Sequence, residues 1–244
     1  MMRRTMQGRV VLVSGASGGI GAAIAAAFAA RGASLMLTGR SQERLDEVAE
    51  DLRQRFAVMV NTVRADLADP AAPARVIDAL RAAYNRLDIL VNNAGVALPG
   101  PLCRTSVEQW DLHMAVNARA PMLLSSQALE LLQHSDDAVI VNIGSVVAHK
   151  GYAGQGAYSA SKHALLGLTR VLAKELQQLG VRVHLVSPGG VATPMISEMR
   201  PDIDVSELMQ PEDVAEAVVF VALARGNALV DEIELRRRSS EPWK

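Results

Sequence analysis

Short apolar segments alternate with longer amphipathic segments along this chain. The short segments carry few charges, which is typical of strands that are buried on both faces of a parallel sheet. They are Val10–Val13, Leu35–Leu37, Val58–Val63, Ile89–Val91, Val139–Val141, Val183–Val186 and Ile233–Leu235. The alternation predicts a doubly wound α/β fold, with a parallel seven-stranded sheet and helices on both faces.

The longer segments have apolar residues at helical spacing. In Gln42–Phe56, for example, Leu45, Val48, Ala49 and Leu52 form one apolar stripe. The other predicted helices are Ala22–Ala30, Pro73–Tyr84, Ser106–Leu132, Tyr158–Leu179 and a last one from Pro211 to about Ala224.

No linker interrupts this alternation, so we expect a single domain over residues 1–244. Its core spans about 8–235. The polar tail 236–244, which contains Arg236, Arg237 and Arg238, is expected to be a solvated end.

Composition excludes several classes of function. Half of the 244 residues are apolar, 21% are charged, and the net charge of -1 offers no broad attraction to nucleic acid or to an anionic membrane. No segment has the ~20 predominantly apolar residues of a membrane span, and no signal peptide follows Met1, so we expect a cytoplasmic protein. One cysteine, Cys103, rules out an internal disulfide, and the five histidines lack metal-ligand spacing, so no metal is expected.

A glycine-rich turn follows the first predicted strand. It runs Ser14-Gly15-Ala16-Ser17-Gly18-Gly19-Ile20-Gly21 and leads into a predicted helix. Glycines let a pyrophosphate approach main-chain N–H groups, and the helix N-terminus attracts the anion. In this strand–turn–helix context the turn predicts dinucleotide binding, with a purely structural turn as the alternative.

Arg40 follows the second predicted strand, where an acidic residue would bind an adenosine ribose 2′-hydroxyl. An arginine can neutralise a 2′-phosphate instead, which favours NADP(H) over NAD(H). The alternative is a surface arginine at the start of a helix.

Three polar residues indicate catalytic chemistry. Ser145 follows an apolar strand, and Tyr158 and Lys162 are four residues apart, so they share one face of a helix. A lysine cation near a phenol stabilises the phenolate and makes the tyrosine a usable acid or base. The alternative is a core tyrosine beside a lysine that reaches solvent.

In its motifs and their order the chain resembles the short-chain dehydrogenase/reductase family, in its short single-domain branch with a Rossmann fold. The family's Thr-Gly-x-x-x-Gly-Ile-Gly pattern appears as Ser14–Gly21, with serine in place of threonine. The other matches are Asn92-Asn93-Ala94-Gly95, Asn117, Ser145, Tyr158 with Lys162, and Pro188-Gly189 followed by Thr193.

The resemblance implies a role for each matched residue. Tyr158 would be the acid in reduction and the base in oxidation, and Lys162 would lower its pKa and hold the nicotinamide ribose. Ser145 would orient the substrate carbonyl, and Asn117 would position a water that connects Lys162 to solvent. The implied cofactor-binding residues are Gly15, Ser17, Gly19, Ile20, Gly21, Arg40, Asp66, Asn93, Ala94, Gly95, Tyr158, Lys162, Pro188, Gly189, Val191 and Thr193. For Asn93 a structural role, bracing neighbouring strands, is equally open.

The resulting hypothesis is an NADP(H)-dependent oxidoreductase that acts on a small or medium-sized carbonyl compound or secondary alcohol. The alternatives are an NAD(H)-dependent alcohol, sugar or steroid dehydrogenase, and a non-catalytic NADP-binding sensor. The resemblance also implies a homo-oligomer, either a tetramer or a dimer, that pairs through Ser106–Leu132 and Tyr158–Leu179. Their apolar residues beyond one stripe include Met122, Leu123, Leu124, Leu165, Leu166 and Leu168.

Three segments are expected to form the substrate pocket, namely Val96–Arg104, Val146–Gly156 and Thr193–Met209. They are mostly apolar or small, so they favour a medium-sized uncharged carbonyl compound. The alternative is that Arg104, His149, Lys150 and Arg200 bind a carboxylate or phosphate.

Overall fold

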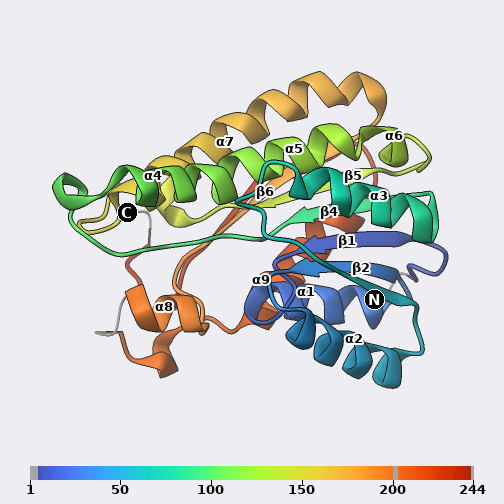
Figure 1. Cartoon of the computed structure of the whole chain (residues 1–244), viewed down its shortest axis with the longest axis horizontal. Helices are drawn as coiled ribbons and strands as arrows, with labels where there is room; N and C mark the ends of the chain where they lie inside the picture. The colour runs from blue at the N-terminus through green and yellow to red at the C-terminus, as the bar shows by residue number, and fades with distance from the viewer. Residues whose placement is uncertain (1–4, 200–202, 243–244) are drawn as a thin grey trace.

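The computed structural model describes residues 5–199 and 203–242, and its strands form a parallel sheet with the order β3-β2-β1-β4-β5-β6-β7 (Figure 1). The strands are β1 Val10–Ser14, β2 Ser34–Gly39, β3 Val60–Arg64, β4 Ile89–Asn92, β5 Val139–Ile143, β6 Arg182–Pro188 and β7 Glu232–Leu235. The predicted doubly wound, seven-stranded sheet is therefore confirmed.

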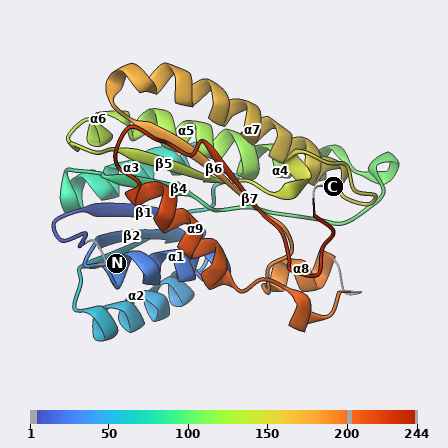
Figure 2. The same cartoon turned by 180° about the vertical axis from the view of Figure 1, so that it is seen from behind.

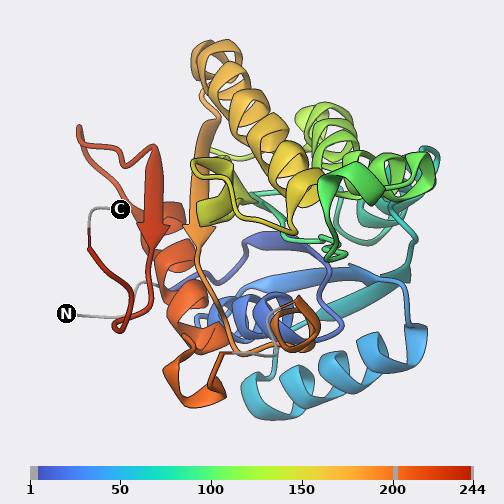
Figure 3. The ribbon, with the colours of Figure 1, turned by 90° about the vertical axis from the view of Figure 1, so that its left-hand side faces the viewer.

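Helices cover both faces of the sheet (Figures 1 and 3). One face packs against α1 Gly19–Ala29, α2 Gln42–Phe56 and α9 Pro211–Leu223, and the other against α3 Ala72–Tyr84, α5 Ala120–Gln127 and α7 Gly156–Leu176. Successive residues of β1 alternate between the two cores: Val11 and Val13 join the first, and Val10 and Leu12 the second. The remaining helical elements are α4 Val107–Met114, α6 Leu129–Leu132, α8 Pro194–Met199 and short turns at Leu102–Arg104, Val146–Ala148, Gln177–Leu179 and Val205–Glu207.

The prediction of one continuous helix over Ser106–Leu132 is wrong. A wider π-helical turn, Ala115–Arg119, separates α4 from α5. A turn at Ala128 then separates α5 from α6. Pro121 explains the first change, because it has no N–H to donate to the carbonyl of Asn117 four residues earlier. The irregular turn therefore falls on a residue that the sequence places in the catalytic set.

The strand order reverses at β1, which lies between β2 and β4. The connections from these strands leave toward opposite faces of the sheet, so their loops separate and open a crevice at the carboxyl ends of the strands. Ligands of open α/β sheets bind in this position, and the predicted functional motifs all follow strands that end there.

Candidate active site

A cavity of about 1170 Å³ lies over the carboxyl ends of the strands. It brings together nearly all of the residues that the sequence proposed for cofactor binding and catalysis. Those that line it are Gly15, Ser17, Gly19, Ile20, Gly21, Arg40, Asp66, Asn93, Ala94, Gly95, Ser145, Tyr158, Lys162, Pro188, Gly189, Val191 and Thr193. Asn117 is fully buried and is not part of the cavity wall.

The turn between β1 and α1 has the shape of an anion cradle. Gly15 and Gly19 have φ angles of +67° and +54°, a backbone conformation that residues with a Cβ rarely adopt. A Cβ on Gly21 would collide with the carbonyl oxygen of Gly15, so only glycine allows α1 to begin this close to the turn. No side chain caps the N-terminus of α1, and its first turn has no acidic residue. The main-chain N–H groups there suit a pyrophosphate.

Asn93 braces this turn. Its Nδ2 donates to the carbonyl oxygens of Ser14 and Gly15 at 2.9 and 3.1 Å. The Ser14 hydroxyl in turn accepts from the main-chain N–H groups of Asn93 and Ala94. The structural interpretation of Asn93 is therefore supported, and the same side chain also lines the cavity.

Two arginines lie at the end of the cavity beside β2. Arg40 and Arg44 both line it, both are exposed, and neither has a carboxylate partner within the part of the chain that the structure describes. Sequence reasoning identified Arg40 but missed Arg44, although Arg44 lies one helical turn after Arg40. These two cations fit a phosphate group on a ribose of the cradled nucleotide.

Ser145, Tyr158 and Lys162 meet at the middle of the cavity. Ser145 follows β5 and accepts a hydrogen bond from the Val147 main-chain N–H, which holds it at the start of a helical turn. Tyr158 and Lys162 lie on the first turns of α7, and the Lys162 Nζ is 5.9 Å from the centroid of the tyrosine ring. Lys162 donates to the carbonyl oxygen of Ile143 at 2.8 Å.

Burial shifts both titratable groups of this trio toward their neutral forms. It raises the pKa of the Tyr158 phenol, although hydrogen bonding to Ser145 offsets part of the rise. It also lowers the pKa of the Lys162 ammonium to about 8. Desolvation thus dominates the pKa of Tyr158 in this structure, and the lowering by Lys162 that the family resemblance implies stays a prediction.

Asn117 has three hydrogen bonds in the π-helical turn. Its Nδ2 donates to the Val96 carbonyl at 2.8 Å and to the Ser161 hydroxyl at 2.9 Å, and its Oδ1 accepts from the Val96 N–H. These bonds fix the loop after β4 against α7. A Cβ on Gly95 would lie 3.4 Å from Asn117 Oδ1 and 3.8 Å from Lys162 Nζ, so both polar groups face this glycine.

His113 is a neighbour of Tyr158 that sequence reasoning dismissed. Its ring is buried and meets the Tyr158 ring edge-on, with 6.4 Å between centroids. Its Nδ1 is 2.7 Å from the Gln109 carbonyl oxygen, and its Nε2 accepts from the Leu98 N–H at 3.1 Å. Both contacts are satisfied by the neutral tautomer that carries its proton on Nδ1. The histidine thus connects the loop after β4 to Tyr158.

Most of the C-terminal tail is exposed, as the sequence predicts, but part of it also lines the cavity. Arg236, Arg237 and Ser240 line the cavity, as do Glu241 and Pro242. The position of the tail could not be predicted from the sequence, because it depends on the pairing of β7 with β6, and these two strands are far apart along the chain. Lys244 and Trp243 lie outside the described residues.

The charged residues proposed for the substrate pocket do not all reach it. Lys150 lines the cavity, but His149 Nε2 contacts Glu232 Oε1 at 2.6 Å, and Arg104 lines a separate small cavity. Arg200 lies outside the described residues. Across the described chain, 5–199 and 203–242, no group of three or more histidine, cysteine or acidic side chains is placed to hold a metal ion.

Known proteins share this fold and about a third of this sequence. The family model for short chain dehydrogenases matches residues 9–204. The 3-oxoacyl-[acyl-carrier-protein] reductase of Aquifex aeolicus is 32% identical over 95% of this chain and 97% of its own length. A metagenomic short-chain oxidoreductase solved in complex with NADP is 34% identical over 95% of this chain and 98% of its own, with a TM-score of 0.83. L-sorbose reductase from Gluconobacter frateurii, solved with NADPH and L-sorbose, is 27% identical over 96% of both chains, with a TM-score of 0.88. This chain therefore belongs to the short-chain dehydrogenase family.

Proposed function

We propose that this protein is an NADP(H)-dependent oxidoreductase that interconverts a carbonyl compound and a secondary alcohol. One observation carries the proposal: Ser145, Tyr158 and Lys162 line the same cavity as the glycine turn and Arg40. The turn would hold the pyrophosphate of the dinucleotide, and the shared cavity would lead from there to the trio. The structural neighbours crystallised with NADP or NADPH support this choice of cofactor.

The side chains divide the chemistry among themselves. A bound nicotinamide would supply the hydride to the carbonyl carbon, or accept it in the reverse direction. The Ser145 hydroxyl holds the carbonyl oxygen, and Tyr158 donates its phenolic proton to that oxygen as it becomes an alcohol. In the reverse direction the same phenolate accepts the alcohol proton. Lys162 supplies positive charge beside the phenol, and Asn117 fixes the helical turn behind it.

The raised pKa of Tyr158 favours reduction at neutral pH. A buried phenol keeps its proton, so the general acid is in its active form. Oxidation needs the phenolate, so we expect it to become faster as the pH rises. We expect this asymmetry in the initial rates of the two directions.

Arg40 and Arg44 support NADP(H) over NAD(H), because an unpaired guanidinium at this position binds a 2′-phosphate. Titration of the protein with NADPH and, separately, NADH tests this point through the fluorescence of the bound nicotinamide. We expect tighter binding of NADPH, and loss of that preference in Arg40→Asp. Equal or tighter NADH binding would instead support an NAD(H)-linked alcohol, sugar or steroid dehydrogenase.

Turnover is tested by NADPH consumption with a panel of aldehydes and ketones. Tyr158→Phe removes only the reacting hydroxyl, so it should abolish turnover and leave NADPH binding close to that of the wild type. Turnover that survives in this variant would show that Tyr158 is not the acid. NADPH binding without turnover on any carbonyl would support the sensor interpretation.

The proposal extends to a cytoplasmic homotetramer. Leu124, Leu165 and Leu166 are buried within the subunit and are unavailable for pairing, which corrects part of the sequence argument. The support comes instead from exposed apolar residues on α4, α5 and α7, namely Val107, Trp110, Met122 and Val171. The free thiol of Cys103 suits a reducing compartment. Sedimentation that gives a particle of 26.0 kDa at micromolar concentration would refute the assembly.

No helix in the described chain has the length and apolar character that crossing a membrane requires.

A further inference from the structure

The C-terminal tail is the part of the cavity wall that the proposed function leaves unexplained. It continues from β7, the strand at the edge of the sheet (Figures 2 and 3). β7 lies two strands from β5, which carries Ser145, and five strands from β2, which precedes Arg40. At ~4.8 Å between strands, the tail begins roughly 10 Å from the catalytic strand and about 24 Å from the Arg40 strand. The tail therefore belongs to the substrate end of the cavity.

Several contacts hold the tail in this position. The main-chain N–H of Gly189 donates to the Leu235 carbonyl at 2.8 Å, just before the tail begins. Arg237 pairs with Glu207 at 3.5 Å and packs beside Gly190, where a Cβ would lie 3.5 Å from the arginine Cδ. Ser239 also donates to Glu207, at 3.2 Å. The tail is thus tied to the loop after β6 and to the segment before α9.

The tail folds back on itself around Arg236. One terminal nitrogen of this side chain donates to the carbonyl oxygens of Arg237 and Ser240, at 3.2 and 2.8 Å. Arg236 has no carboxylate partner among residues 5–199 and 203–242. The other guanidinium nitrogens have no protein acceptor within these ranges. A guanidinium that is anchored by one nitrogen presents its remaining donors as a fork.

The charges at this end of the cavity favour an anion of low charge. The lining contains four basic side chains, Lys150, Lys162, Arg236 and Arg237, against two carboxylates, Glu234 and Glu241. Lys150 lies 3.7 Å from Glu234, and Arg237 is paired with Glu207, so Arg236 is the tail cation left for a ligand. Glu234 and Glu241 oppose a doubly charged phosphate more strongly than a singly charged carboxylate.

We propose that the substrate carries a carboxylate in addition to its carbonyl group, and that Arg236 binds this carboxylate. This inference rests on the proposed function, because it assigns the far end of the same substrate. The planar fork of arginine matches a carboxylate, and charge-assisted hydrogen bonds of this kind are stronger than neutral ones.

The test compares oxo acids with their methyl esters, which keep the carbonyl and lose the charge. Initial rates of NADPH oxidation are measured with 4-oxopentanoate, 5-oxohexanoate and the two esters. We expect kcat/KM to be at least about tenfold higher for one acid than for its ester, as a charge-assisted hydrogen bond implies. In Arg236→Gln this ratio should fall by roughly the same factor.

Arg238→Gln is the matched control, because Arg238 is an exposed arginine of the same tail that does not line the cavity. Arg238→Gln changes the net charge by the same amount as Arg236→Gln, but it should keep the wild-type ratio of kcat/KM for the acid to kcat/KM for the ester. An equal fall in both variants would refute a specific contact and indicate a general charge effect. An ester that is reduced as well as its acid would overturn the inference directly.

A second measurement does not depend on turnover. The melting temperature of the NADPH-loaded protein is measured with each acid and ester, and the acids alone should raise it in the wild type and in Arg238→Gln. If the protein reduces neutral ketones but the acids neither raise its melting temperature nor react faster than their esters, the inference is overturned and the proposed function stands. If no carbonyl compound is reduced, the proposed function fails, and the melting temperatures decide whether the tail binds a carboxylate.

Discussion

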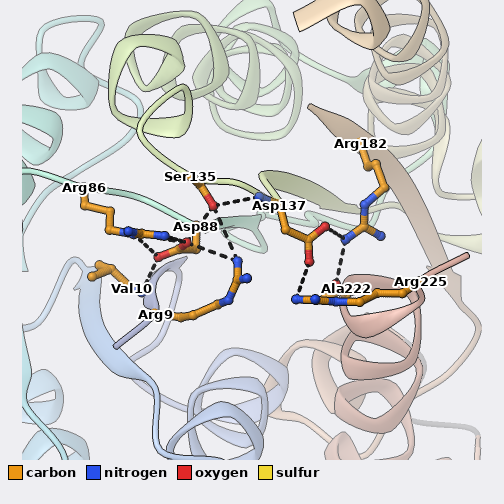
Figure 4. Close-up of polar contacts among 9 residues, drawn as sticks. All are labelled: Arg9, Val10, Arg86, Asp88, Ser135, Asp137, Arg182, Ala222 and Arg225. Carbon is orange, nitrogen blue, oxygen red and sulfur yellow. Dashed lines mark hydrogen bonds and ion pairs between the residues drawn. The ribbon is translucent and has the colours of Figure 1, made fainter. Parts of the chain in front are cut away.

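The amino ends of the strands carry a polar network whose disruption should destabilise the fold without disturbing the active site. Asp88 is its centre, with a fully buried side chain just before β4 (Figure 4). Its carboxylate accepts from the Val10 N–H at 2.8 Å, the Ser135 hydroxyl at 2.6 Å and the Arg86 guanidinium at 2.8 Å. Arg9 adds a fourth donor at 3.2 Å. One carboxylate thus joins the starts of β1, β4 and β5.

Asp88→Asn keeps the size of this side chain and removes its charge. One acceptor oxygen becomes an NH₂ group that faces a donor, and a hydrogen bond to a charged group contributes about 1.5–3 kcal/mol. Arg9 and Arg86 are 21% and 35% exposed, so water screens part of the ionic contribution. We expect a loss of about 2–4 kcal/mol in the free energy of unfolding. For a chain of this size that corresponds to a fall of roughly 5–15 °C in Tm.

The pH dependence of this loss has a definite sign. Burial opposes ionisation of Asp88, but the hydrogen bonds from Arg86, Ser135 and Val10 outweigh it, and the pKa of the carboxyl is lowered. A lowered pKa stabilises the fold above the unfolded value of about 3.9 and loses that contribution as the pH falls toward the folded value. The difference between wild type and Asp88→Asn should therefore be constant from pH 6 to 8 and shrink below about pH 4.

The assay is urea unfolding at fixed protein concentration, extrapolated linearly to water. The control is Asp51→Asn, which breaks an exposed pair with Arg55 at 2.7 Å and should cost no more than about 0.5 kcal/mol. A loss in Asp88→Asn as small as in the control, or one that grows as the pH falls to 3, would refute the reasoning. At 20 °C the kcat of Asp88→Asn should match the wild type, because the network lies at the opposite end of the strands from Tyr158.

Three further predictions concern the active site. Reduction should slow as the pH rises through about 8, because Lys162 loses its charge there; initial rates from pH 6 to 10 measure this, and a flat profile would contradict it. His113→Phe removes the acceptor for the Leu98 N–H, so kcat/KM should fall about tenfold, with partial recovery in His113→Gln; kinetics as fast as the wild type would show the histidine to be dispensable. Gly21→Ala places a methyl group against the Gly15 carbonyl and should abolish NADPH binding, as titration would show.

The parts of the site that could be predicted from sequence are those that depend on local chain geometry. The cradle needs glycines at fixed spacing after a strand, and Tyr158 and Lys162 share a helix face because they are four residues apart. Both relations hold whatever the rest of the chain does. The same is true of the strands, whose buried apolar segments stand out between polar helix surfaces.

The features that were missed depend on contacts between distant segments. His113 looks like any other histidine on a helix until the loop after β4 brings the Leu98 N–H to its Nε2. The rise in the pKa of Tyr158 comes from burial, which is a property of the packed protein and cannot be seen in the four-residue spacing of Tyr158 and Lys162. The π-helical turn at Asn117 could have been predicted from the sequence, since Pro121 has no N–H to continue a regular α-helix.

The two ends of the sheet differ in how far a substitution there affects the rest of the protein. At the amino ends, Asp88 binds donors from β1 and from the segments that precede β4 and β5, so a change there alters the stability of the whole fold. At the carboxyl ends, Ser145 and Tyr158 are held by β5 and α7, whereas Arg236 depends on a short tail attached to an edge strand. A substitution in that tail alters the far wall of the substrate cavity and leaves the reacting groups in place. On the proposed assignment, the residues that select the substrate can therefore change without loss of the proposed chemistry, which is why the reaction is easier to propose from this sequence than the molecule that undergoes it.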